Sequence, residues 1–135
     1  MLKIGEYNVY IGDMHIHTNY SDGDNIIKVF DRINSLGYDF VAITDHDEPN
    51  GSLEMQNVCR KLGSPLLVIN GSEISSGEGH ILSINSTEKI PVMPDLKESC
   101  RIVREKGGIA IAAHPYWEDI GARKCPAEWE VITLL

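Results

Sequence analysis

A short alternating run near the start of the chain, DMHIH at positions 13–17, constrains the fold most strongly. Side chains two positions apart in an extended strand point to the same face, so Asp13, His15 and His17 share one side. Two neighbouring imidazoles form half of a metal site, and a carboxylate beside them can orient a ring through its N–H group. The alternative is a surface strand that carries polar residues. The apolar run 9–11 predicts a strand that ends at this motif.

The other three histidines also lie at the edges of apolar, strand-like runs: His46 after 41–43, His80 before 81–84 and His114 after 109–113. An acidic residue, Glu73, follows a further apolar run at 66–69. No histidine falls on the face of an expected helix. Histidines scattered through a core or over a solvated surface would not be distributed in this way, so the pattern indicates one site at the ends of several strands.

Helical and strand-like patterns alternate along the chain. Helices are expected from Asp24 or Asn25 to Gly37, from a turn at 49–51 to Gly63, and from Asp95 to Lys106. Strands are expected at 40–44, 65–71, 80–84 and 109–113. This alternation predicts an α/β fold built from parallel βα units.

Six short motifs occur in a fixed order: DMHIHT at 13–18, SDG at 21–23, TDHD at 44–47, GSE at 71–73, GH at 79–80 and AHP at 113–115. In this order and spacing they resemble the polymerase and histidinol phosphatase (PHP) superfamily of metal-dependent phosphoesterases. The resemblance covers residues 8–116, most of the chain. It implies a distorted (β/α)7 barrel with metal ions at the carboxyl-terminal mouth, the end where parallel α/β folds place their sites.

The resemblance also implies how metal ligands divide among two or three divalent ions. It places His15 and His17 on one ion, His80 and His114 on a second, and His46 with Asp22 on a third. Glu73 would bridge the first ion to the second. Imidazole and carboxylate ligands without thiolate suit Zn, Mn or Fe and do not choose among them.

Three further aspartates, Asp13, Asp45 and Asp47, have the chemistry to orient ligands or to protonate a leaving group. The sequence does not assign these tasks among the three. Asp47 has a second interpretation, in which its side chain caps the turn that follows it.

The family pattern closes with a late Asp-x-His motif, which this chain does not contain. We therefore expect residues 1–135 to form a single domain, the N-terminal part of a PHP barrel truncated after about five βα units. Such a truncation would leave two unpaired barrel edges, and exposed edges favour pairing with another chain. A homo-oligomer formed through these edges is the expected assembly.

The composition restricts partners and location. A net charge of −8 argues against a broad nucleic-acid surface, although it does not exclude nucleic acid at a metal site. No apolar run approaches the roughly 20 residues of a membrane span, so no membrane partner is expected. The three cysteines are odd in number and far apart, which favours a reducing cytoplasm. Cys59 and Cys100 are expected in the core, and Trp117 and Trp129 are interpreted as packing residues in preference to substrate platforms.

The resemblance and the ligand pattern together predict a metal-dependent phosphoric ester hydrolase. Its substrate would be a small phosphoester or a nucleotide, attacked by a metal-activated hydroxide. Two alternatives stay open: a non-catalytic metal-binding or structural module, and a metal-dependent amidohydrolase. Against the amidohydrolase, no lysine stands at a strand end where it would form a carbamylated metal bridge. Because the late motif is absent, the chain by itself is expected to be a weak or inactive catalyst.

Overall fold

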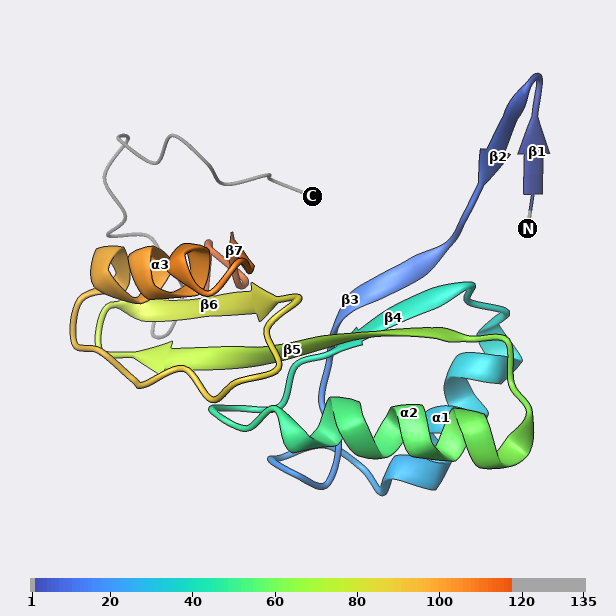
Figure 1. The fold of residues 1–135 in the computed structure, drawn as a ribbon, viewed down its shortest axis with the longest axis horizontal. Helices are drawn as coiled ribbons and strands as arrows, with labels where there is room; N and C mark the ends of the chain where they lie inside the picture. The colour runs from blue at the N-terminus through green and yellow to red at the C-terminus, as the bar shows by residue number, and fades with distance from the viewer. Residues whose placement is uncertain (1, 118–135) are drawn as a thin grey trace.

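The computed structural model describes residues 2–117 and shows five strands curled into a half-barrel sheet in the order β3-β4-β5-β6-β7 (Figure 1). The strands are β3 (Gly12–Ile16), β4 (Phe40–Ile43), β5 (Leu67–Ser76), β6 (Gly79–Ile84) and β7 (Ile109–Ala112). The helices are α1 (Ile26–Leu36), α2 (Asn50–Leu62) and α3 (Leu96–Glu105). The mixed α/β class expected from the sequence is confirmed.

The helix boundaries follow caps that the sequence provides. The side chain of Asn25 accepts a hydrogen bond from the first turn of α1, and Gly37 ends that helix with a φ of 70°. Asp95 caps α3 in the same way as Asn25 caps α1. One boundary differs from expectation, because α2 begins at Asn50, inside the expected turn at 49–51. Within residues 2–117, no helix combines the length and the apolar character needed to cross a membrane.

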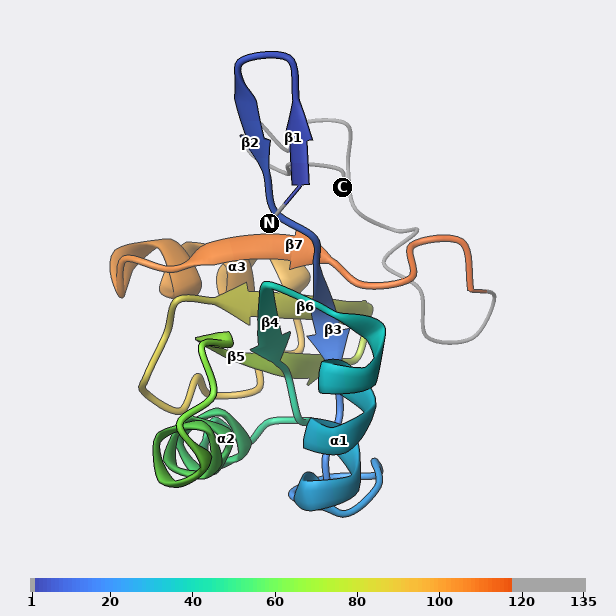
Figure 2. The ribbon, with the colours of Figure 1, turned by 90° about the vertical axis from the view of Figure 1, so that its right-hand side faces the viewer.

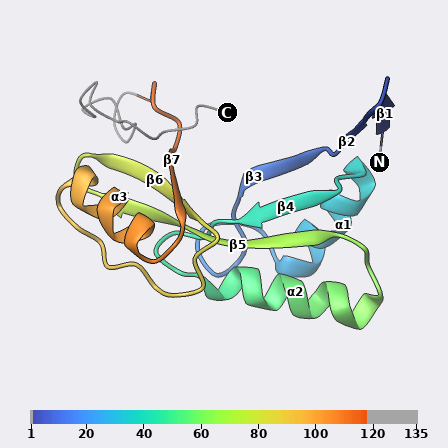
Figure 3. The same cartoon turned by 45° about the horizontal axis from the view of Figure 1, so that its top comes forward.

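Strand β5 joins the two halves of the sheet (Figure 3). Its residues 67–70 pair in parallel with β4, and its residues 71–76 pair antiparallel with β6. At the changeover, a Cβ added to Gly71 would stand 3.1 Å from the carbonyl oxygen of Ile43, so the close approach of the two strands favours glycine. The prediction that this strand stops at Gly71 is wrong. The extension carries Glu73 beyond the end of β4.

The prediction of parallel pairing throughout is wrong for β6 and β7. Strands β3, β4 and β5 are parallel, whereas β6 is antiparallel to β5 and β7 is antiparallel to β6. Only Gly77 and Glu78 connect β5 to β6, and a two-residue connection can join only antiparallel neighbours. Residues 2–117 therefore contain two parallel βα crossovers, through α1 and α2, in place of about five. Because β7 again runs in the direction of β5, the strand ends that carry histidines meet on one side.

Apolar residues on both faces of the sheet hold it rigid. One buried cluster packs β4 and the first half of β5 against α1 and α2, and it includes Cys59. A second cluster packs β6 and β7 against α3 and includes Cys100. A third lies on the concave face and joins β4, β6 and β7 through Ala42, Leu82 and Ile111. The expected core positions of the two cysteines are confirmed.

An antiparallel hairpin of β1 (Leu2–Ile4) and β2 (Tyr7–Val9) projects from the body of the protein (Figure 2). The sequence predicted a single strand at 9–11 ending at the histidine motif, and this prediction is wrong. The chain reverses at Gly5, which has a φ of 59°, and β3 starts afresh at Gly12. Most of the histidine motif therefore lies inside β3.

Candidate metal centre

Glu73 lies at the centre of a cluster that contains all five histidines of the chain, and its side chain is only 1% exposed. Its Oε2 atom lies 2.9 Å from His15 Nε2 and 2.8 Å from His17 Nε2. Its Oε1 atom lies 2.9 Å from His80 Nδ1 and 2.9 Å from His114 Nε2. Each oxygen of this one carboxylate therefore lies within 2.9 Å of two imidazoles.

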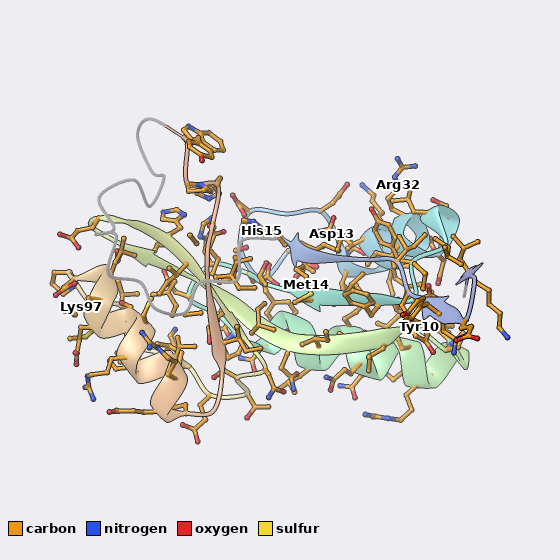
Figure 4. The ribbon with its side chains drawn as sticks, turned by 90° about the horizontal axis from the view of Figure 1, so that it is seen from above. Tyr10, Asp13, Met14, His15, Arg32 and Lys97 are labelled. Atoms are coloured by element: carbon orange, nitrogen blue, oxygen red, sulfur yellow. The ribbon has the colours of Figure 1, made fainter. Side chains whose placement is uncertain are left out.

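The sheet topology brings these side chains together. His15 lies near the end of β3, His80 near the start of β6, and His114 shortly after the end of β7. Because β6 runs opposite to its neighbours, its start lies beside the end of β7. A backbone bridge pairs His46, just beyond β4, with Glu73 in β5. Figure 4 shows His15 near the middle of the molecule, between α1 and α3.

Asp22 extends the cluster towards solvent. Its Oδ1 atom lies 2.6 Å from His17 Nδ1, and its Oδ2 atom lies 3.8 Å from His46 Nε2. His46 Nδ1 lies 3.0 Å from the hydroxyl of Ser75 and 3.6 Å from Glu73 Oε2. His17 and His46 therefore each present one ring nitrogen to Asp22 and the other to Glu73.

Asp45 lies beside the cluster and is fully buried. Its Oδ1 atom accepts hydrogen bonds from the backbone N–H of Thr18, at 2.7 Å, and from the Ser21 hydroxyl, at 2.8 Å. Its Oδ2 atom accepts from the Thr18 hydroxyl at 2.8 Å. Both oxygens are thus engaged by the loop that connects His17 to Asp22. The contacts make Asp45 the anchor of that loop.

Asp47 and Asp13 contact the backbone of the strands that carry ligands. The Asp47 N–H donates to the Glu73 carbonyl at 2.8 Å, and Asp47 Oδ1 accepts from the Ser75 N–H at 3.0 Å. These two bonds hold Asp47 against the edge of β5 that does not pair with β6. Asp47 itself has a φ of 52°, in the left-handed region. Asp13 Oδ1 accepts from the backbone N–H of His15 at 3.0 Å, where an imidazole N–H was expected.

The contacts within the cluster shift pKa values in opposite directions. Burial raises the pKa of the Glu73 carboxyl, but hydrogen bonds from His15 and His17 outweigh burial and hold that pKa well below its usual range. The hydrogen bond to Glu73 raises the pKa of His17 to about 9 against the opposing effect of burial. A hydrogen bond from His17 holds the pKa of the Asp22 carboxyl below its usual value. Glu73 therefore remains an anion at neutral pH, paired with the imidazole of His17.

Five of the six motifs that build this cluster fall entirely within the range matched by one family model. The family model described as PHP domain matches residues 13–113. The chain belongs to the PHP domain family. The resemblance inferred from the six motifs is thereby confirmed. His114, which also contacts Glu73, lies one position outside the matched range.

Two relatives are similar to this chain in sequence, and one solved structure is similar to it in fold. An uncharacterized protein of Methanocaldococcus jannaschii is 34% identical over 119 residues, which cover 77% of this chain and 67% of the relative. The 5′-3′ exoribonuclease of Haemophilus influenzae is 33% identical over 104 residues, which cover 73% of this chain and 37% of that protein.

The solved structure is a two-domain protein of Bacteroides vulgatus that contains a predicted PHP-like metal-dependent phosphoesterase. It matches with a TM-score of 0.69 and 24% identity, over 81% of this chain and 36% of that one. This match shows that the PHP domain described here shares its fold. The domain spans little more than a third of the Haemophilus and Bacteroides proteins.

The donor set of this PHP domain fits divalent metal ions. Three groups each bring one ligand atom per residue to within 4.8 Å of the others: His15 with His17 and Glu73, His17 with Asp22 and His46, and His46 with Glu73 and His80. His114 joins them through its contact with Glu73 Oε1. The donors are imidazole nitrogens and carboxylate oxygens, which is the chemistry preferred by ions such as Zn, Mn and Fe. How the donors divide among individual ions stays a prediction.

A groove between the edge strands β3 and β7 leads to the cluster. It has a volume of about 550 Å³ and is lined by Met14 and His15 on one side and by Ile111 and His114 on the other. Small-molecule sites commonly have volumes in this range. Because His15 and His114 face different oxygens of Glu73, a ligand in the groove can contact one imidazole of each pair.

Three hydroxyl groups that hold the cluster, those of Thr18, Ser21 and Ser75, carry no distinctive signal in the sequence. The motif DMHIHT includes Thr18, and SDG includes Ser21, but neither motif shows that the hydroxyl points to a buried aspartate. Ser75 stands among other serines in β5 and is identified only by its contact with His46.

The interpretation of Trp117 as a packing residue is wrong. Its side chain is 57% exposed, and its ring lies 5.3 Å from the ring of His114. The signal available in the sequence was its position, three residues after a histidine of the predicted site. Trp129 lies outside the described residues.

Proposed function

We propose that this domain is the metal-binding part of a phosphoesterase that hydrolyses a phosphate monoester or diester through a metal-activated hydroxide. One observation carries the proposal: the two oxygens of the Glu73 carboxylate each face two imidazoles. A buried carboxylate placed between two pairs of nitrogen donors suits two cations held close together. Membership of the PHP family supports this assignment.

Divalent ions bound here would supply an activated water at neutral pH and would neutralise the charge of a phosphoryl group. His15 and His17 would hold one ion, His80 and His114 a second, and His46 with Asp22 a third. Glu73 lies between the first two positions.

The three aspartates differ in the tasks that their contacts allow. Asp45 positions the loop between His17 and Asp22, because both of its oxygens accept hydrogen bonds from that loop. Asp47 positions β5 through its hydrogen bond from Ser75. Asp13 lines the groove beside the cluster, and we therefore assign to it the exchange of a proton with the leaving group.

The proposed substrate is a small phosphoester or a nucleotide. The groove of about 550 Å³ accommodates a ligand of that size, and the negative charge of the chain disfavours a long polyanion outside the cluster. The exoribonuclease relative makes ribonucleotide phosphodiesters one class to assay. We propose a cytoplasmic location, because the thiols of Cys59 and Cys100 are unpaired and buried.

The direct test is an assay of the protein encoded by the complete reading frame against 4-nitrophenyl phosphate and bis(4-nitrophenyl) phosphate. Added Mn²⁺ or Zn²⁺ should support turnover, and a chelator should abolish it. His114→Asn should lower kcat by orders of magnitude, because an imidazole in contact with Glu73 is lost. Since every histidine belongs to the cluster, the control is Glu6→Gln, an exposed change in the hairpin that should leave kcat unchanged.

Two results would contradict the proposal. Hydrolysis of amides or lactones with phosphoesters inert would assign the protein to the amidohydrolases. Tight metal binding without turnover of either class would identify a non-catalytic module.

A further inference from the structure

Two large aromatic side chains that follow His114 in the sequence are exposed. Tyr116 is 84% exposed and Trp117 is 57% exposed. Indole side chains are usually well buried in folded proteins, because their large apolar surface gains free energy when it leaves water. Exposure by itself is common in this protein, since Tyr7 in the hairpin is 78% exposed. The position of Trp117 is what distinguishes it.

The backbone fixes Trp117 against a residue of the cluster. The N–H of Trp117 donates to the carbonyl of His114 at 3.0 Å, which closes a turn over Pro115. His114 has a φ of 30° in the left-handed region, and the ring of Pro115, the next residue, fixes the φ of that residue. The two rings lie 5.3 Å apart between centroids at an interplanar angle of 69°. The indole therefore has a defined place beside an imidazole.

The organic group of a phosphoester bound at the metal centre would reach the indole of Trp117. His114 contacts Glu73 as well as Trp117, since its Nε2 atom lies 2.9 Å from Glu73 Oε1. A phosphoryl group held at that carboxylate would sit one imidazole ring away from the indole. The two rings meet edge to face at 69° rather than in a parallel stack, and with 57% of its side chain exposed Trp117 keeps apolar surface accessible to a ligand.

An exposed indole recognises planar groups. Base–aromatic stacking contributes about 1–3 kcal/mol per base and tolerates different bases, because every base presents a flat π face. Saturated groups of similar size gain apolar contact but no comparable stacking. The metal cluster would bind the phosphoryl group of a substrate. Selectivity for the rest of the substrate would then depend on neighbouring residues such as Trp117.

We propose that Trp117 is a specificity-determining residue that stacks on a planar aromatic group of the substrate, so the preferred substrates are phosphoesters with an aryl group or a nucleobase. This inference rests on the proposed phosphoesterase function. It adds a substrate feature that the metal ligands do not determine.

The first measurement is binding seen by tryptophan fluorescence. The chain has two tryptophans, so the Trp129→Phe variant leaves Trp117 as the single indole. Adenosine 5′-monophosphate should quench its fluorescence saturably, whereas ribose 5-phosphate, which carries the same phosphate without a base, should not. An equal response to the two probes, or no response to either, overturns the inference.

The second measurement is selectivity between benzyl phosphate and cyclohexylmethyl phosphate, two substrates of similar size that differ in the planarity of the ring. Trp117→Ala should lower the ratio of their kcat/KM values roughly five- to a hundredfold, and Trp117→Phe should restore most of it. The control Tyr7→Ala removes an even more exposed aromatic side chain from the hairpin and should leave the ratio unchanged. A ratio unaffected by Trp117→Ala overturns the inference.

The two proposals fail in different ways. Binding of adenosine 5′-monophosphate requires no turnover, so base-dependent quenching without phosphoester hydrolysis contradicts only the proposed function. Hydrolysis with an unchanged selectivity ratio in Trp117→Ala contradicts only the role of Trp117.

Discussion

Thr18 donates both its backbone N–H and its hydroxyl to the buried carboxylate of Asp45, at 2.7 Å and 2.8 Å. These bonds tie the start of the loop after β3 to the residues that follow β4. The same loop carries Asp22, and His17 immediately precedes Thr18. The positions of two candidate ligands therefore depend on a carboxylate that does not itself face the cluster.

Replacing Asp45 by asparagine should destabilise the protein. The amide keeps the size of the carboxylate but has one acceptor oxygen, so its NH₂ group would face a donor of Thr18 or Ser21. Loss of charge-assisted bonds in a buried position should lower the free energy of unfolding by roughly 2–4 kcal/mol. Urea denaturation followed by circular dichroism measures the change.

The matched control for this prediction is Asp31→Asn, an identical chemical change on an exposed position of α1. It should alter the free energy of unfolding by no more than about 0.5 kcal/mol. Equal effects of Asp45→Asn and Asp31→Asn would show that the loop is held by other contacts.

Gly51→Ala should also destabilise the protein, although alanine ordinarily stabilises a helix. A Cβ at this position in α2 would stand 1.9 Å from Asp45 Oδ2 and 3.1 Å from the Thr18 hydroxyl. The overpacking should cost roughly 1–3 kcal/mol and outweigh the gain of about 1 kcal/mol in helix propensity. Thermal or urea unfolding, compared with the neighbouring exposed change Asn50→Ala, measures the difference. A more stable Gly51→Ala variant would refute the close packing at Asp45.

The thiols of Cys59 and Cys100 should resist modification in the folded protein. Burial raises the pKa of both thiols, and that of Cys100 to about 11. The reactive species is the thiolate, so at pH 8 a pKa of 11 leaves about one thiol in a thousand ionised. Labelling with a thiol reagent should accelerate as the pH rises towards 11 or when denaturant opens the core.

A Cys125→Ser background restricts this measurement to the two cysteines within the described residues. Fast labelling of either thiol at pH 8 without denaturant would contradict the packing of α2 or α3.

The helices and the convergence of the histidines could be predicted from the sequence because their determinants are local. Asn25 and Gly37 mark the ends of α1 through their own backbone preferences. Likewise, the placement of every histidine at the edge of an apolar run predicted that the imidazoles converge. The structure brings all five imidazoles to the carboxylate of Glu73.

The strand directions could not be predicted as reliably, because pairing is a tertiary property. Apolar runs at 80–84 and 109–113 look the same in parallel and antiparallel sheets. The informative signal in the sequence was that the segment between the strands expected at 65–71 and 80–84 is shorter than the dozen or so residues that a parallel crossover needs. The extension of β5 to Ser76 depends on its change of partner from β4 to β6.

The roles of the aspartates could not be predicted because their contacts come from distant parts of the chain. Asp45 and Asp47 lie on either side of His46, and the sequence does not show which of them has a catalytic role. The fold buries Asp45 against Thr18, 27 positions away, and pairs Asp47 with Ser75, 28 positions away. The contacts in the folded protein are needed to show that Asp45 anchors a loop whereas Asp13 lines the groove.

The central claim is that Glu73 joins two pairs of imidazoles into one metal centre, and metal content of a Glu73→Gln variant tests it most directly. Glutamine keeps the shape of the side chain but removes the negative charge and one acceptor oxygen. After dialysis against Mn²⁺ or Zn²⁺, elemental analysis should find at least about one equivalent in the wild type and in the exposed control Glu6→Gln. Glu73→Gln should lose most of that metal while retaining its fold by circular dichroism. Unchanged metal content in Glu73→Gln would contradict the account.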